Sequence, residues 1–144
     1  MKKRSSCPIS SALDIFGDKW SLLVMRDLLF REKTHYREFH ASEEGVATNI
    51  LADRLARLER AGLIRKTGGD PRSGKQSYVA TAKGKDLIPV LFEMMLWSAK
   101  HLPETITPPE LLAELKKDKK RAAREVRRRG GIEPFLLRGR IHGA

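Results

Sequence analysis

Thr48 and Asn49 are the residues whose chemistry is best suited to recognising another molecule, because they open a predicted helix over residues 48–60. An Asn side chain can hydrogen-bond adenine through two atoms at once, and a Thr methyl group can contact the methyl group of thymine. The N-terminal end of a helix also favours phosphate. These two residues are therefore candidate contacts to double-stranded DNA.

Arginines follow on the same predicted helix. Arg54 and Arg57 can neutralise phosphates, but Asp53 and Glu59 can equally hold such cations in surface ion pairs. Both interpretations stay open at this stage, and both arginines are kept as candidate DNA contacts.

Arg72 and Lys75 lie in the segment GGDPRSGK, which is dense in residues typical of turns. Such a segment contributes nothing to a core and exposes its two cations, which could reach a minor groove or the backbone beside it. The alternative is a hairpin tip that is merely solvated.

Cys7 is the only cysteine, so an intrachain disulfide is excluded. It precedes Pro8 at the start of a predicted helix, close to the basic residues 2–4, where a reactive thiolate would be favoured. Cys7 is thus a candidate redox sensor; the alternative is a small structural residue.

The remaining polar residues give no sign of catalysis or metal binding. The four histidines have no metal-binding spacing, and GGDPRSGK lacks the spacing of a phosphate-binding loop. We therefore expect no enzyme, no metal and no cofactor.

The charge of the chain points to a polyanionic partner. The formal net charge is +11 over 144 residues, and residues 108–144 contribute 11 Lys and Arg against 5 Asp and Glu. No apolar stretch approaches the roughly 20 residues needed to span a bilayer. We expect a cytoplasmic protein with no membrane partner, in which residues 1–107 form a DNA-binding and dimerisation domain and residues 108–144 form a basic helix and tail.

The elements that would position these residues follow from periodicity. Leu51, Leu55 and Leu58 share one face of the helix over 48–60, leaving the opposite face free of core contacts. Helices are predicted over 8–16, from Asp18 to about residue 30, and through 36–39. Residues 63–67 and 76–81 are predicted to pair as a β-hairpin.

A further helix is predicted over 82–102, bent at Pro89. It has a wide apolar surface that favours a dimer interface, with a drug-binding pocket as the alternative. Another helix, increasingly basic, should start at Pro109 and stop before Gly130. The candidate interface residues are Leu87, Leu91, Met94, Met95 and Trp97.

The segments CPIS, LDIFGDKW, LADRLARLERAGLI and YVATAKGKDLIPVL together resemble the HxlR family of bacterial regulators, over roughly residues 7–102. The resemblance implies a homodimer, joined by N-terminal and C-terminal helices, that binds a two-fold related operator. It also implies a scaffold role for Trp20. The family usually has Ser at the cap of the recognition helix and often Pro after it, whereas this chain has Ala47 and Thr48.

The sequence thus predicts a mainly α-helical winged helix-turn-helix with a small β-hairpin wing and extra terminal helices for dimerisation. The expected function is that of a sequence-specific transcriptional regulator, repressor or activator, with room for an unidentified small-molecule effector. The alternatives are a regulator that senses oxidants or electrophiles through Cys7, and an architectural protein that binds DNA through charge alone.

Overall fold

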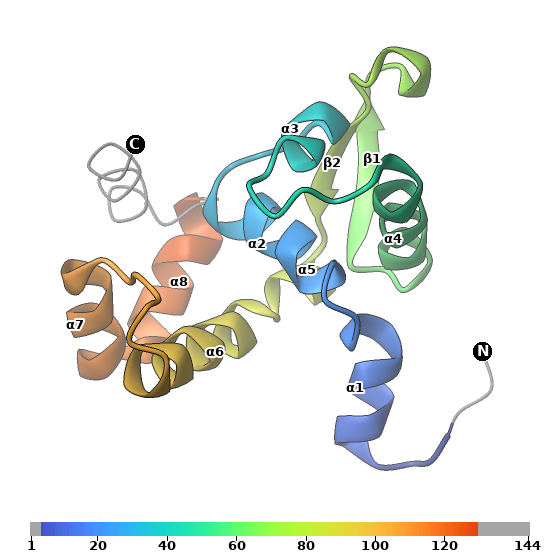
Figure 1. The fold of residues 1–144 in the computed structure, drawn as a ribbon. Helices are drawn as coiled ribbons and strands as arrows, with labels where there is room; N and C mark the ends of the chain where they lie inside the picture. The colour runs from blue at the N-terminus through green and yellow to red at the C-terminus, as the bar shows by residue number, and fades with distance from the viewer. Residues whose placement is uncertain (1–3, 130–144) are drawn as a thin grey trace.

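The computed structural model describes residues 4–129, except for the side chain of Pro71, and Figure 1 shows how the elements are arranged. Residues 1–3 and 130–144 lie outside the described range. The elements are α1 (Pro8–Phe16), α2 (Ser21–Phe30), α3 (Tyr36–His40), α4 (Thr48–Arg60), β1 (Ile64–Gly68), the 3-10 turn η1 (Pro71–Ser73), β2 (Ser77–Ala80), α5 (Ala82–Lys85), α6 (Ile88–His101), α7 (Pro109–Lys117) and α8 (Lys119–Arg129).

The first helix, α1, projects from the rest of the chain in Figure 1, and none of its residues is buried, although Phe16 at its end packs against the core. Pro8 occupies its first turn, where a missing N–H costs nothing. It ends at Gly17, whose N–H donates to the Leu13 carbonyl at 2.8 Å. The predicted helix over 8–16 is confirmed.

A single hydrophobic core surrounds α2. Leucines 51, 55 and 58 of α4 are at most 2% exposed, which confirms the predicted apolar seam of that helix. Phe30 of α2 stacks on Phe92 of α6, with ring centroids 5.6 Å apart. Burial of such side chains is the dominant favourable contribution to folding.

The hairpin pairs β1 with β2 in antiparallel register, with Ile64 opposite Ala80 and a bulge between Lys66 and Gly68. Gly69 has a φ of +91°, and a Cβ there would lie 1.9 Å from the Lys75 carbonyl oxygen, so only glycine fits this tip. The predicted hairpin is confirmed. So is the mainly helical class, with the two-stranded antiparallel sheet as its only sheet in the described range.

The predicted single helix over 82–102 is wrong in one respect, because the chain forms two helices, α5 and α6, rather than one bent helix. Pro89 lies in the first turn of α6, where it needs no hydrogen-bond partner. Gly84 in α5 packs so closely on the residue before β1 that a Cβ would lie 2.1 Å from the Leu63 carbonyl oxygen. This close approach fixes α5 against the hairpin.

The predicted helix from Pro109 to Arg129 is likewise divided, at Asp118, which has extended backbone angles. Its carboxylate accepts the Arg121 N–H at 3.1 Å and so caps α8. Leu111, Leu115 and Val126 are at most 4% exposed and belong to the same core as α2. Within the described range, the division after residue 107 marks a change of charge and not a separate core.

No helix of the described range is both long and apolar enough to cross a membrane.

Candidate nucleic-acid interface

The helix α4 presents a solvent-facing strip opposite its buried leucines. Thr48 and Asn49 are both exposed at its N-terminal end, as are Ala52 and Asp53 along the strip. The cap position is Ala47, which provides no side-chain hydrogen bond, and the helix starts at Thr48. The Tyr36 hydroxyl donates to the Thr48 carbonyl oxygen at 3.1 Å, so α3 holds this end of α4.

Arg54 does not lie on this strip. Its Nε donates to the Asp18 carboxylate at 3.0 Å, its Nη1 contacts Asp53, and its side chain is only 19% exposed. The geometry therefore favours a structural role for Arg54, tying α4 to the start of α2. Its prediction as a DNA contact is not supported by this arrangement.

Arg57 is closer to the predicted role. Its side chain is 49% exposed and pairs with Asp53 at 3.0 Å, one helical turn away. An exposed pair of this kind is weak, so a phosphate could replace the carboxylate at small cost. Arg57 remains a candidate phosphate contact.

Asp18 organises the first turn of α2. Its carboxylate accepts the backbone N–H groups of Trp20 and Ser21 at 2.8 and 2.9 Å and the Ser21 hydroxyl at 2.6 Å. Partial burial acts to raise the pKa of Asp18, but these hydrogen bonds and the one from Arg54 outweigh burial and lower that pKa to about 2. Asp18 is thus a charged anchor that joins the first turn of α2 to α4.

The turn between α3 and α4 is held by charged pairs with α2. Arg26 contacts Glu44 at 2.6 Å and Arg31 contacts Glu43 at 2.9 Å. The hydrogen bond from Arg31 is the main cause that lowers the pKa of Glu43 to about 2. These pairs tie the turn between α3 and α4 to α2 and to Arg31 directly after it.

The wing exposes both predicted cations, Arg72 and Lys75. The Asp70 carboxylate accepts the Arg72 backbone N–H at 3.0 Å and so braces the start of η1. Gln76 is 7% exposed and donates to the Gly68 carbonyl oxygen at 2.5 Å, closing the base of the tip. Hydrogen bonds thus brace the tip at η1 and at its base.

A groove of about 580 Å³ separates α4 from the wing and brings together residues that the sequence had not linked. Arg37 of α3 and Lys66 of β1 line it beside Arg72, and Glu59 is the acidic residue on its wall. Arg37 lies against Gly74, where a Cβ would approach its side chain to 2.9 Å. Sequence reasoning missed Arg37 and Lys66 because only the folding of the wing over α3 places them beside the strip.

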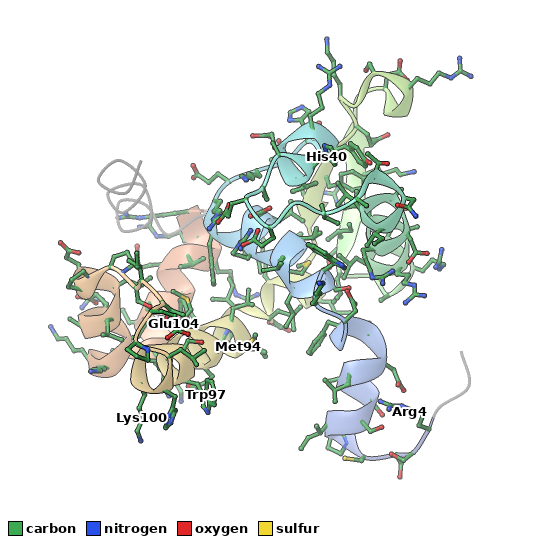
Figure 2. All side chains as sticks on the ribbon, viewed as in Figure 1. Arg4, His40, Met94, Trp97, Lys100 and Glu104 are labelled. Atoms are coloured by element: carbon green, nitrogen blue, oxygen red, sulfur yellow. The ribbon has the colours of Figure 1, made fainter. Side chains whose placement is uncertain are left out.

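The predicted dimer residues fall into two groups. Met94 and Trp97 are 49% and 59% exposed on α6, where Figure 2 labels them, and Met95 is half-buried. Leu87 and Leu91 are 8% and 6% exposed because they pack in the core of the protomer itself. Their side chains therefore have little surface left for a partner. Met94, Met95 and Trp97 remain the candidate interface residues.

Cys7 is exposed at the N-terminal cap of α1. The nearby Arg4 pairs with Asp14 at 2.8 Å instead of with the thiol. Among the described residues, no group of three or more His, Cys, Asp or Glu side chains is arranged to hold a metal ion.

Three comparisons with other proteins fit this arrangement. The chain is 33% identical over 88 residues to sll1512 of Synechocystis, named as an uncharacterised HTH-type transcriptional regulator; the match covers 61% of this chain and 64% of that protein. A crystal structure of PA1607, described as a transcription factor, matches with a TM-score of 0.62 at 35% identity over 72% of each chain. The oxidised redox regulator HypR shares the fold, with a TM-score of 0.57 at 23% identity over 66% of this chain and 97% of that one.

The chain thus spans just under two thirds of the Synechocystis protein. The family pattern covers a longer part, residues 15–106, which run from the end of α1 to the segment after α6. The chain belongs to the HxlR-like helix-turn-helix family.

Proposed function

We propose that the protein is a transcriptional regulator that binds a specific sequence of double-stranded DNA as a homodimer. The observation that carries this proposal is the exposed strip of α4, which begins with Thr48 and Asn49 and is flanked by the cationic wing. A helix with its side chains is about 10–12 Å wide and matches a major groove about 12 Å wide.

The two parts of the interface have different tasks. Asn49 and Thr48 offer hydrogen-bonding and methyl groups to base edges, which is where sequence is read. Arg72 and Lys75 offer charge to the backbone or minor groove, which positions the protein without reading sequence. Lys66 and Arg37 add charge in the groove between these parts.

A two-fold operator requires a two-fold protein, and the apolar surface of the protomer supports one. Ile9 and Leu13 of α1 are 71% and 49% exposed, and Met94 and Trp97 of α6 are similarly open. Large apolar side chains exposed together mark an interaction surface. We assign these two helices to the dimer interface, in agreement with the resemblance described above.

The test compares DNA upstream of the protein's own gene with a scrambled duplex of the same composition, titrated at several salt concentrations. We expect a preference for the upstream DNA that persists as salt rises, together with a two-fold footprint. Equal affinity for both duplexes at every salt concentration would instead identify an architectural protein that binds through charge alone.

The dimer is tested by Trp97→Asp, which places a charge in the apolar face. Analytical ultracentrifugation should show a folded monomer and the loss of the two-fold footprint. Ala113→Asp puts the same charge on the exposed side of α7 and should leave the dimer intact. A dimeric Trp97→Asp protein would exclude this face.

A second candidate function is thiol-based sensing. Cys7 is exposed two residues before Ile9, so a modified thiol would stand next to the proposed dimer interface. DNA affinity should then change after treatment with a quinone or a hypochlorite, and Cys7→Ser should abolish the change. An unaltered response in the Cys7→Ser protein rules this function out.

A further inference from the structure

The helix α8 carries cations that neither the core nor the proposed DNA interface uses. Lys120, Arg121 and Arg124 are exposed and make no ion pair within the described residues. At about 100° per residue the three positions fall within about 100° of helix circumference. We call these three residues the α8 cationic stripe.

The opposite side of α8 holds the helix in place. Val126 is 4% exposed in the common core, and Ala122 and Ala123 pack against it. On that side Lys119 pairs with Glu93 of α6 at 2.5 Å. Arg127 lies next to Lys120 on the helix circumference and pairs with Asp86 at the end of α5, which holds the edge of the stripe. The stripe is therefore presented on a docked helix.

The stripe lies away from the recognition helix. Both α4 and α8 contact α2, and Figure 1 shows them on opposite sides of it. The cations of α8 therefore cannot contact the same short stretch of DNA phosphate backbone as the α4 strip of their own protomer. They require another stretch of polyanion.

The chemistry of the surface favours nucleic acid over a membrane. A membrane-surface helix needs large apolar side chains that insert beside its cations. The exposed large apolar residues of the described range lie on α1, on α6 and at Ile106, and none lies on α7 or α8. Arginine, which supplies two of the three cations, matches phosphate with two parallel hydrogen bonds.

We propose that the α8 cationic stripe binds the phosphate backbone of a DNA segment other than the one contacted by α4 and the wing. The inference rests on the proposed function, since DNA bound at α4 supplies the polymer. The protein would then hold flanking DNA that bends back toward it, or a second duplex.

The test isolates the stripe by weakening the other surface first. In full-length protein carrying Asn49→Ala, Arg72→Ala and Lys75→Ala, we expect residual binding to a scrambled duplex. Adding Lys120→Ala, Arg121→Ala and Arg124→Ala should reduce the salt slope of log K by about 2 to 3, since each phosphate contact contributes about 0.9. At about 100 mM salt the affinity should fall more than tenfold.

Two controls keep this test decisive. Lys120→Arg, Arg121→Lys and Arg124→Lys preserve the charge and should preserve the slope. In the otherwise native protein, the three alanines should leave the ratio of affinities for upstream and scrambled DNA unchanged.

A salt slope of log K that is unchanged by the three alanines overturns the proposal. A lower ratio of affinities for upstream and scrambled DNA also overturns it, because it would place the stripe within the α4 interface. Binding of the weakened protein to phosphatidylserine vesicles in place of the duplex, abolished by the three alanines, also overturns it. The salt slope is measured on scrambled DNA, so it tests the stripe separately from sequence preference. The stripe proposal can hold even if the intact protein shows no preference for upstream DNA, which is the outcome that refutes sequence-specific regulation.

Discussion

Asp18 shows how much of the recognition surface depends on a residue outside it. Its carboxylate caps α2 and holds Arg54 of α4 at 3.0 Å. Asp18→Ala should lower the free energy of unfolding by about 1 to 2 kcal/mol at neutral pH, the usual cost of a lost cap. Urea denaturation of both proteins measures the difference.

The same variant has a defined pH dependence. The pKa of Asp18 is about 2 in the folded protein and 3.8 without these interactions, so its charge stabilises the fold above that higher value. The difference between the native protein and Asp18→Ala should therefore shrink as the pH falls from about 4 to about 2. Glu104→Ala, at an exposed position, is the control and should leave the free energy of unfolding nearly unchanged at neutral pH.

Asn49 is the residue whose loss should affect sequence preference most directly. Asn49→Ala should reduce the discrimination between upstream and scrambled DNA by about 1 to 3 kcal/mol, the contribution of one bidentate base contact. Competition binding measures it. Arg57→Ala should weaken binding to upstream and to scrambled DNA by the same factor. If Asn49→Ala also lowered both affinities equally, Asn49 would not read bases.

At the scale of elements, α4 lacks a helix cap that its position allows. Ala47 has extended backbone angles suited to a cap but no side-chain acceptor. Ala47→Ser should raise the free energy of unfolding by about 1 kcal/mol. Ala52→Ser, in the exposed interior of the same helix, should lower it slightly. If Ala47→Ser lowered the free energy of unfolding, the hydrogen bond from Tyr36 to the Thr48 carbonyl would be holding this end of α4 in a geometry that a serine cap disturbs.

The wing should contribute affinity without preference. Arg72→Ala with Lys75→Ala should reduce the salt slope of log K by about 2, because two phosphate contacts are lost. The ratio of affinities for upstream and scrambled DNA should stay the same. Lys100→Ala, at an exposed position of α6, is the control and should leave the slope unaltered. A changed ratio would indicate that the wing reads sequence.

Local sequence determined α4 and the hairpin well, because leucines at four- and three-residue intervals and a tip rich in glycine leave few alternatives. Local sequence says less where distant contacts decide. Arg54 looked like its neighbour Arg57 until the fold brought Asp18, 36 positions away, against it. The close approach of Gly84 to Leu63, 21 positions away, is likewise a contact that periodicity cannot reveal.

At the scale of the whole molecule, α7 and α8 extend the core of the helix-turn-helix. Leu115 is 1% exposed in the cluster that includes α2 and α6. Leu115→Ala should lower the free energy of unfolding by about 2 to 5 kcal/mol, in one transition detected by all probes. Lys116→Ala, exposed next to it, should have little effect. Separate transitions would show that the C-terminal helices unfold independently.

The separation of Arg54 from the α4 strip has a consequence for how this protein could evolve. The side chains that anchor α4 face inward, to Asp18 and the core, while the side chains of Thr48 and Asn49 are exposed, and Thr48 holds Tyr36 only through its backbone carbonyl. Under the function proposed above, substitutions at those two positions would alter the preferred DNA sequence with little penalty in folding. Regulators built on this frame could then diverge in their targets without losing stability.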